Sequence, residues 1–172
     1  MKPDTCKRCW PMLLTCLLAA CATGSQPPQA SQASVDAMLS RIHQAAAHDQ
    51  SAIHVVPLRA PGVQVLQQQA ASATIKGDLD TAEDRLKRAL QLEPGSPPLL
   101  QAQAELALRE HRWKHAEQKA LDSWKRGPQV GPLCARNWQT VIEVRHLQDD
   151  APGVSTATKW LKSCHAEGVH RY

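Results

Sequence analysis

The chain has 172 residues and a mass of 18.9 kDa, which suits a single domain. Its net charge is +4, but Lys and Arg are interspersed with Asp and Glu, so no basic stripe for nucleic acid is present. Aromatic residues make up only 3% of the chain, while Ala, Leu and Gln are common, and this composition favours helices over strands. We therefore expect an all-α protein that does not bind nucleic acid.

The first twenty residues have the order of a secretory signal. Three basic residues lie within the first eight positions, and an apolar stretch of about eleven residues follows from Trp10 to Ala20. A helix that spans a bilayer needs about twenty apolar residues, so this stretch is too short for one. We expect residues 1–20 to be a cleaved signal peptide, and the CKRC sequence at residues 6–9 to be removed with it instead of serving as a redox pair.

The signal ends in the sequence LAAC, Leu18 to Cys21, which resembles the lipobox of bacterial lipoproteins. The resemblance implies cleavage before Cys21, diacylation of this cysteine and acylation of the new N-terminus, and two or three acyl chains give durable membrane anchoring. Ala22 is not the aspartate that retains such lipoproteins in the inner membrane, so the resemblance implies an outer-membrane lipid anchor with the body facing the periplasm. The mature chain would carry a charge of +2, which predicts no strongly charged partner.

The segment after the anchor predicts a tether, a helix and a connector. Residues 21–34 are small, polar and contain prolines, as in a flexible tether. In the region 35–62 we expect an amphipathic helix near residues 34–48, capped by Ser34, and then an extended connector that lies on the body. The helix is indicated by apolar residues at helical spacing: Val35, Met38, Leu39 and Ile42.

From Val63 onward the chain repeats itself with an offset of 34 residues. The pairs that coincide are Leu66 with Leu100, Ala70 with Ala104, Ala73 with Ala107, Ala82 with Ala116, and Pro94 with Pro128. A period of this size predicts stacked helical hairpins. In the first unit, Gly77 suits a left-handed turn, and Asp80 with Glu83 predicts a capping box at the start of the second helix. Ser96 before a proline predicts the next helix start.

These residues resemble the tetratricopeptide-repeat family. The first unit, residues 63–96, contains GDLDTAEDRLKRALQLEP, and the second, residues 97–130, keeps the alanines and the closing proline. A third unit, residues 131–168, is degenerate, because Trp138 stands where a small residue belongs. The resemblance implies an all-α fold over residues 63–168, a short α-solenoid of stacked antiparallel helix hairpins whose terminal unit has a different outer face.

Stacked helical hairpins present a concave face that holds peptides. We expect a groove for a protein or peptide partner where the first helix of each unit turns its remaining residues outward, although a merely soluble face is the alternative. The candidate groove residues are Gln64, Gln67 and Ala71, then Gln101, Glu105 and Arg109, then Gln139 and Glu143. The resemblance points to an adaptor or assembly factor for an envelope complex, such as pilus, secretion or cell-wall machinery.

Eight histidines raise a second hypothesis, an envelope enzyme or a metal- or ligand-binding lipoprotein. His111 and His115 have the spacing of ligands on one helix, but they flank the predicted turn, and no further residue completes a recognisable site. The chain after the signal has no serine elbow and no phosphate-binding loop. We therefore expect no enzymatic activity, no cofactor and no metal.

Cys134 and Cys164 are the two cysteines that remain after the signal and the lipidated Cys21, in a compartment where disulfides persist. With the third turn centred near Asp150, they lie 16 residues before it and 14 after it. These distances are roughly 24 and 21 Å along two antiparallel helices. We predict a disulfide that joins the degenerate hairpin, the alternative being two small buried side chains that do not meet.

Overall fold

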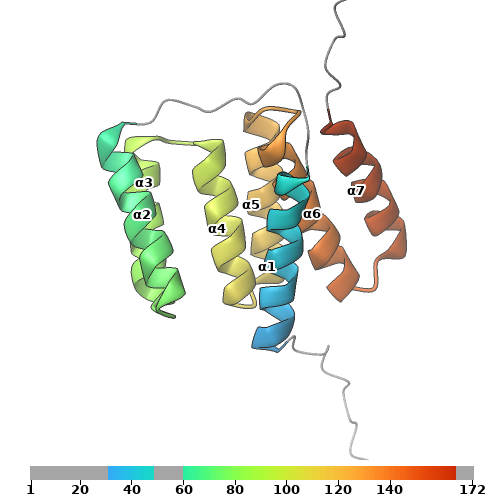
Figure 1. Cartoon of the computed structure of the whole chain (residues 1–172), viewed down its shortest axis with the longest axis horizontal. Coiled ribbons are helices and arrows are strands. Elements are labelled where there is room, and N and C mark those ends of the chain that lie inside the picture. The colour runs from blue at the N-terminus through green and yellow to red at the C-terminus, as the bar shows by residue number, and fades with distance from the viewer. Residues whose placement is uncertain (1–30, 49–59, 166–172) are drawn as a thin grey trace, which may run out of the picture.

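The protein is described by a computed structural model of residues 31–48 and 60–165 (Figure 1). Within these residues there are seven helices and no strand, so the predicted all-α class is confirmed. The helices are α1 (Gln32–Ala47), α2 (Pro61–Ile75), α3 (Leu79–Leu92), α4 (Pro97–Arg109), α5 (Trp113–Arg126), α6 (Pro132–Leu147) and α7 (Ala151–Ser163). Over this described part of the chain, every helix is too short or too polar to cross a bilayer.

Helices α2 to α7 form three antiparallel hairpins, which stand side by side in chain order (Figure 1). The hairpins are α2–α3, α4–α5 and α6–α7, and successive ones meet through α3 with α4 and through α5 with α6. The predicted stack of hairpins is therefore confirmed. We call the face that α2, α4 and α6 turn toward α1 the inner face, because the first helix of every hairpin contributes to it.

Helix α1 packs on the inner face, mainly against α6 and also against α4 (Figure 1). Its predicted apolar stripe is buried throughout, with exposed fractions between 0% and 4%. The helix begins at Gln32 and is capped by Ser31, whose hydroxyl accepts a hydrogen bond of 3.3 Å from the backbone N–H of Ser34. The prediction that Ser34 is the cap was wrong, because the serine one turn earlier reaches the free N–H groups of the first turn.

The start of α2 corrects the predicted connector. Residues 49–59 lie outside the described residues, but Pro61 and Gly62 belong to the first turn of α2 and are not extended. Proline at the first position of a helix costs no hydrogen bond, since an N–H at this position would have no partner inside the helix. The first hairpin therefore begins two residues before Val63.

The three hairpin turns use one backbone conformation with different residues. Gly77 has a φ of 77°, as its place in the turn predicts. The matching positions in the next two turns are His111, with a φ of 57°, and Asp149, with a φ of 54°. A residue with a side chain costs about 1–2 kcal/mol in this left-handed region. The second and third turns are therefore less favourable locally than the first.

The caps agree in part with the predicted starts. Ser96 and Pro97 begin α4 as expected. Helix α3 is capped by Asp78, whose carboxylate accepts a hydrogen bond of 3.1 Å from the N–H of Thr81. The side-chain and backbone hydrogen bonds from Thr81 lower the pKa of Asp78. The capping box predicted at Asp80 was wrong, because that residue already lies inside the first turn of the helix.

Small residues let neighbouring helices approach closely. The alanines expected to make these contacts are all buried: Ala70, Ala82, Ala104 and Ala116. Where Ser123 stands for a small residue in α5, its hydroxyl donates a hydrogen bond of 2.8 Å to the carbonyl of Pro97, so it is buried at no cost in unpaired polar atoms. The repeat pattern therefore describes the packing of the stack well.

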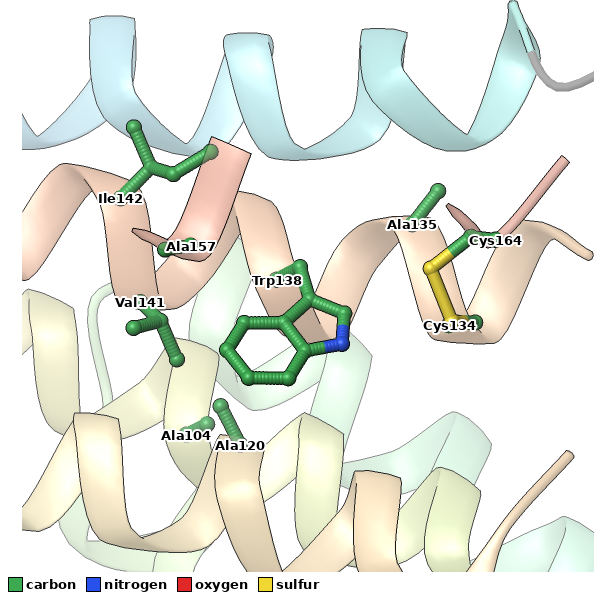
Figure 2. Close-up of a cluster of buried hydrophobic side chains, with 9 residues drawn as sticks. All are labelled: Ala104, Ala120, Cys134, Ala135, Trp138, Val141, Ile142, Ala157 and Cys164. Atoms are coloured by element: carbon green, nitrogen blue, oxygen red, sulfur yellow. A yellow bond between two sulfur atoms is a disulfide. The ribbon is translucent and has the colours of Figure 1, made fainter. Parts of the chain in front are cut away.

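The third hairpin is held by contacts that the repeat pattern lacks. Cys134 and Cys164 form a disulfide with their Cα atoms 5.6 Å apart, so the predicted bond is present in the structure (Figure 2). Trp138 is buried and stacks on Trp160 of α7, with ring centroids 5.5 Å apart. Trp124 of α5 packs edge-on against both rings. The large side chain at the small-residue position thus fills the space between three helices.

Candidate functional site

The candidate site is the inner face, and α1 already occupies the part of it that α4 and α6 form. Figure 2 shows α1 running along α6, with Ala135 and Ile142 turned toward it, while Trp138 and Val141 point the other way, toward Ala104 and Ala120. The predicted groove residues of α4 and α6 therefore lie near a helix of the same chain. The sequence predicted the groove but not this occupant.

An apolar stripe carries the contact between α1 and the stack. The four stripe residues of α1 form one cluster with Ala107, Leu108 and Ala116 of α4 and α5 and with Val144 of α6, flanked by Trp113 and Leu147. Each large buried side chain contributes roughly 1.5–3 kcal/mol. An isolated helix of this length is only marginally stable in water. We infer that α1 is helical because it is docked.

An ion pair fixes one edge of α1. The guanidinium of Arg41 donates to both carboxylate oxygens of Glu143, at 2.8 and 2.6 Å, in a two-pronged contact. The Glu143 side chain is 5% exposed, and it also accepts a hydrogen bond of 2.8 Å from Gln139. The hydrogen bond to Glu143 raises the pKa of Arg41. A buried carboxylate is thus neutralised from the α1 side.

The other edge of α1 meets a second carboxylate, that of Glu105. Its oxygens contact His43 of α1 at 3.0 Å, Arg136 of α6 at 3.0 Å and the amide of Gln101 at 2.9 Å. Burial raises the pKa of Glu105, but the bonds and charges of His43, Arg136 and Gln101 outweigh it and hold the pKa below its usual value. This carboxylate therefore remains charged at neutral pH and connects α1, α4 and α6.

A third contact joins the N-terminal part of α1 to the end of α4. Arg109 donates a hydrogen bond of 2.9 Å to the carboxylate of Asp36. Together with the two pairs above, it shows that Glu105, Arg109 and Glu143 of the predicted groove bind the chain's own helix.

Gln101 corrects the predicted groove. Its side chain is completely buried, and its amide nitrogen also donates a hydrogen bond of 3.0 Å to the hydroxyl of Thr140. It joins α4 to α6 and is not accessible to a partner. Spacing alone placed Gln101 on the same helix face as Glu105, but the close approach of α4 and α6 covers this end of that face.

Beside α1 the inner face is open, and we call this part the open cleft. It is a cavity of about 310 Å³ between α1, α2 and α4. Its apolar lining comes from Leu39, Ala70, Ala71, Ile75, Leu86, Ala102 and Leu106, and its polar lining from His43, Gln67, Thr74, Glu105, Arg109 and Arg136. Ile75 is 87% exposed, which is unusual for so large an apolar side chain. The open cleft thus has an apolar wall and a charged wall.

The remaining predicted groove residues divide between the two sides of α1. Gln67 and Ala71 line the open cleft, whereas Gln64 is exposed on α2 outside its lining. Gln139 lines a second cavity of about 440 Å³ on the far side of α1, beside the first turns of α6 and the end of α7. Cationic and imidazole side chains surround this second cavity: Arg41, His48, Lys162 and His165.

The histidines that suggested a metal are separated by the fold. His111 lies in the turn before α5 and packs edge-on against Trp113, whereas His115 lies within α5. Burial lowers the pKa of His115, and the charges of Arg112 and Lys119 lower it further. Across residues 31–48 and 60–165, no group of three His, Cys, Asp or Glu side chains is placed to hold a metal ion. The lipidation site predicted at Cys21 lies outside the described residues.

The fold and the inner face define a class of protein: a stack of antiparallel helix hairpins with a further helix bound across the first helices of the stack. No protein-family model, curated protein or solved structure matches the chain.

Proposed function

We propose that this protein is a lipid-anchored adaptor of a bacterial cell envelope, which binds a helix or peptide of a partner protein on its inner face. The observation that carries the proposal is the binding of α1: the inner face holds an amphipathic helix through an apolar stripe and ion pairs at its edges. Partner helices are held in grooves by the same combination of anchors. The open cleft continues this surface beside α1.

The repeat supports a partner with a mainly apolar contact surface. With the 34-residue offset, Glu105 and Arg109 of α4 correspond to Ala71 and Ile75 of α2. On α4 these two residues form ion pairs with α1. On α2 the equivalent side chains are uncharged, and both of them line the open cleft. A partner segment would place an apolar side against α2 and polar groups near Arg136 and Glu105, an arrangement of apolar centre and polar rim that is typical of interfaces.

The location belongs to the proposal as well. The signal and the LAAC sequence support an anchor at Cys21 in the outer membrane, with the hairpins in the periplasm. The Cys134–Cys164 disulfide agrees with an oxidising compartment. The resemblance to tetratricopeptide repeats supports a role in assembling or joining an envelope complex of the pilus, secretion or cell-wall type.

Site-specific crosslinking in cells tests the partner. A photo-crosslinking residue at Ala71, in the open cleft, should capture one envelope protein, whereas the same residue at Gln91, exposed on α3, should not. Ala71→Arg should abolish co-purification of that protein, and Gln91→Arg should leave it intact. Equal capture at both positions, or an Ala71→Arg variant that keeps its partner, would contradict the proposal.

Fractionation tests the anchor separately. Cys21→Ser should move the protein out of the outer-membrane fraction and remove the added lipid mass. If the variant stays in that fraction with an unchanged mass, the lipid anchor is wrong, whatever the crosslinks show.

A further inference from the structure

We propose that the surface covered by α1 is itself a partner-binding site, and that α1 is an exchangeable occupant of it. We call this surface the α1 groove; it comprises Glu105, Leu108, Glu143, Val144 and Leu147. The inference rests on the proposed function and names the partner's chemistry. The partner is an amphipathic helix with apolar side chains at the spacing of Val35, Met38, Leu39 and Ile42, and with an Arg or Lys at the position of Arg41.

The groove itself dictates this chemistry. Without α1, the carboxylate of Glu143 would stand in an apolar surface with Gln139 but without its guanidinium partner. Leaving a buried charge unpaired is strongly unfavourable, so any replacement must bring a cation to the same place. Leu108 and Val144, both fully buried under α1, must again be covered by apolar side chains. A helix that lacks either feature would bind poorly.

The organisation of the core makes exchange possible. Of the three apolar clusters in the described residues, the one in α2, α3 and α4 contains no residue of α1. The one around Trp138 meets α1 through Ala45, on the side where Ala135 and Ile142 face this helix (Figure 2). The release of α1 would therefore uncover part of α4 and α6, while the contacts that join successive hairpins, α3 with α4 and α5 with α6, would stay in place. The covalent link from α1 to the stack runs only through the chain between His48 and Ala60.

The edges of α1 offer a way in. The side chains of Asp36, Arg41 and His43 are 57%, 51% and 59% exposed, although each makes an ion pair or hydrogen bond to the stack. Leu39 and His43 line the open cleft along one flank of α1, and His43 is the exposed one of the two. A partner helix is thus able to make its first contacts in the open cleft before α1 leaves. The exchange then has two steps: the partner binds in the open cleft, and α1 is displaced afterwards.

A synthetic peptide tests the exchange in the whole mature chain. The probe is a fluorescent peptide of residues 31–48, which carries the chemistry that the proposal assigns to the partner. Ile42→Glu in the chain places a charge at a fully buried position and should release the resident α1. We expect the peptide to bind this variant at least tenfold more tightly than the wild type. Ala37→Glu, the same new residue at an exposed position of α1, should bind it like the wild type.

A charge exchange tests the register. Glu143→Gln in the Ile42→Glu chain should weaken binding of the peptide at least tenfold, since a buried charge pair loses one member. It should have much less effect on a peptide that carries Arg41→Gln. Equal weakening for both peptides would mean that the peptide does not lie as α1 does, and the inference would be wrong.

Hydrogen exchange on the wild type keeps the test valid if Ile42→Glu fails to fold. Excess peptide should speed exchange of the α1 amides and leave those of α3 unchanged, as expected for local opening. If α1 exchanges only together with α4 and α6, it is not exchangeable and the inference fails. If concentrated wild-type protein forms dimers that the peptide dissociates, the occupant is a second copy and not a partner helix. Crosslinks in the open cleft would survive either failure, so the proposed function is tested separately.

Discussion

The two ends of the hairpin stack are built by different means. The first hairpin, α2–α3, follows the repeat closely and is held by alanines and leucines, with no disulfide and no aromatic side chain. The third hairpin, α6–α7, departs from the repeat and has a disulfide, a tryptophan cluster and a docked helix. Where the small-residue pattern is lost, covalent and aromatic contacts replace it. The open cleft lies on the side of the simpler end.

The largest expected effect is at the third hairpin. Replacing Cys134 and Cys164 together by Ala removes a link across 30 residues, which should lower the free energy of unfolding by about 3–4 kcal/mol. Hydrogen exchange should then speed up in α6 and α7 but not in α2 and α3. Denaturant titration of oxidised wild type and of the double variant measures the change. Two reactive thiols per mature, lipidated chain in denatured, unreduced wild type would show that the bond does not form.

The second prediction compares two isoleucines. Ile42→Ala in α1, at a fully buried position, should cost about 2–4 kcal/mol, because it removes three methyl or methylene groups from a packed cluster. Ile75→Ala in α2 makes the same chemical change at a side chain that is 87% exposed, and it should cost less than about 0.5 kcal/mol. Urea unfolding of both variants is the measurement. Similar costs at the two sites would mean that the part of the inner face under α1 and the open cleft do not differ as described.

The third prediction concerns pH. Because the pKa of Glu105 is lower in the folded chain, its charge stabilises the fold above the ordinary pKa of 4.5, and this stability is lost as the pH falls through the lower folded pKa. At pH 7, Glu105→Gln should cost about 1.5–3 kcal/mol through weaker bonds to Arg136 and Gln101. The difference in the free energy of unfolding between Glu105→Gln and wild type should shrink as the pH falls well below 4.5. A constant difference at every pH would rule out a role for the charge.

The smallest expected effects are at the turns. Gly77→Ala should cost about 1 kcal/mol, because the left-handed backbone penalises a Cβ that meets no other atom within 4 Å. His111→Gly, at the equivalent place, should stabilise the chain by up to about 1 kcal/mol. Melting curves of the two single variants test the pair. Shifts in the same direction would show that contacts, and not backbone conformation, decide these positions.

The sequence predicted the local features of the fold better than the long-range ones. The 34-residue period gave the hairpins, and counting residues from the turn at Asp150 gave the disulfide, since both depend on regular helix geometry. The stripe of α1 showed that this helix must be buried, but not where. Its anchor, Arg41 with Glu143, joins residues 102 positions apart, and no periodicity reports such a pair.

The candidate site was predicted only in part, because residue spacing reports helix faces but not long-range contacts. Spacing identified Glu105 and Arg109 as residues that bind something, and they do contact a helix, the chain's own α1. Spacing also included Gln101, which is buried because α4 and α6 approach each other there. The error in the cap of α3, Asp78 instead of Asp80, is one of register. Helix faces are readable from sequence, whereas the depth at which a neighbouring helix covers them is not.

The tryptophans are unevenly distributed, so intrinsic fluorescence reports on only part of the fold. Trp124, Trp138 and Trp160 touch one another where α5 meets the third hairpin, and Trp113 packs beside the cluster that holds α1. Helices α2 and α3 contain no aromatic residue. Intrinsic fluorescence therefore reports on unfolding of the C-terminal helices and of the α1 groove, while far-ultraviolet circular dichroism reports on every helix. Recording both signals during one titration reveals the unfolding of the first hairpin, silent in emission, as the part of the ellipticity change that has no counterpart in fluorescence.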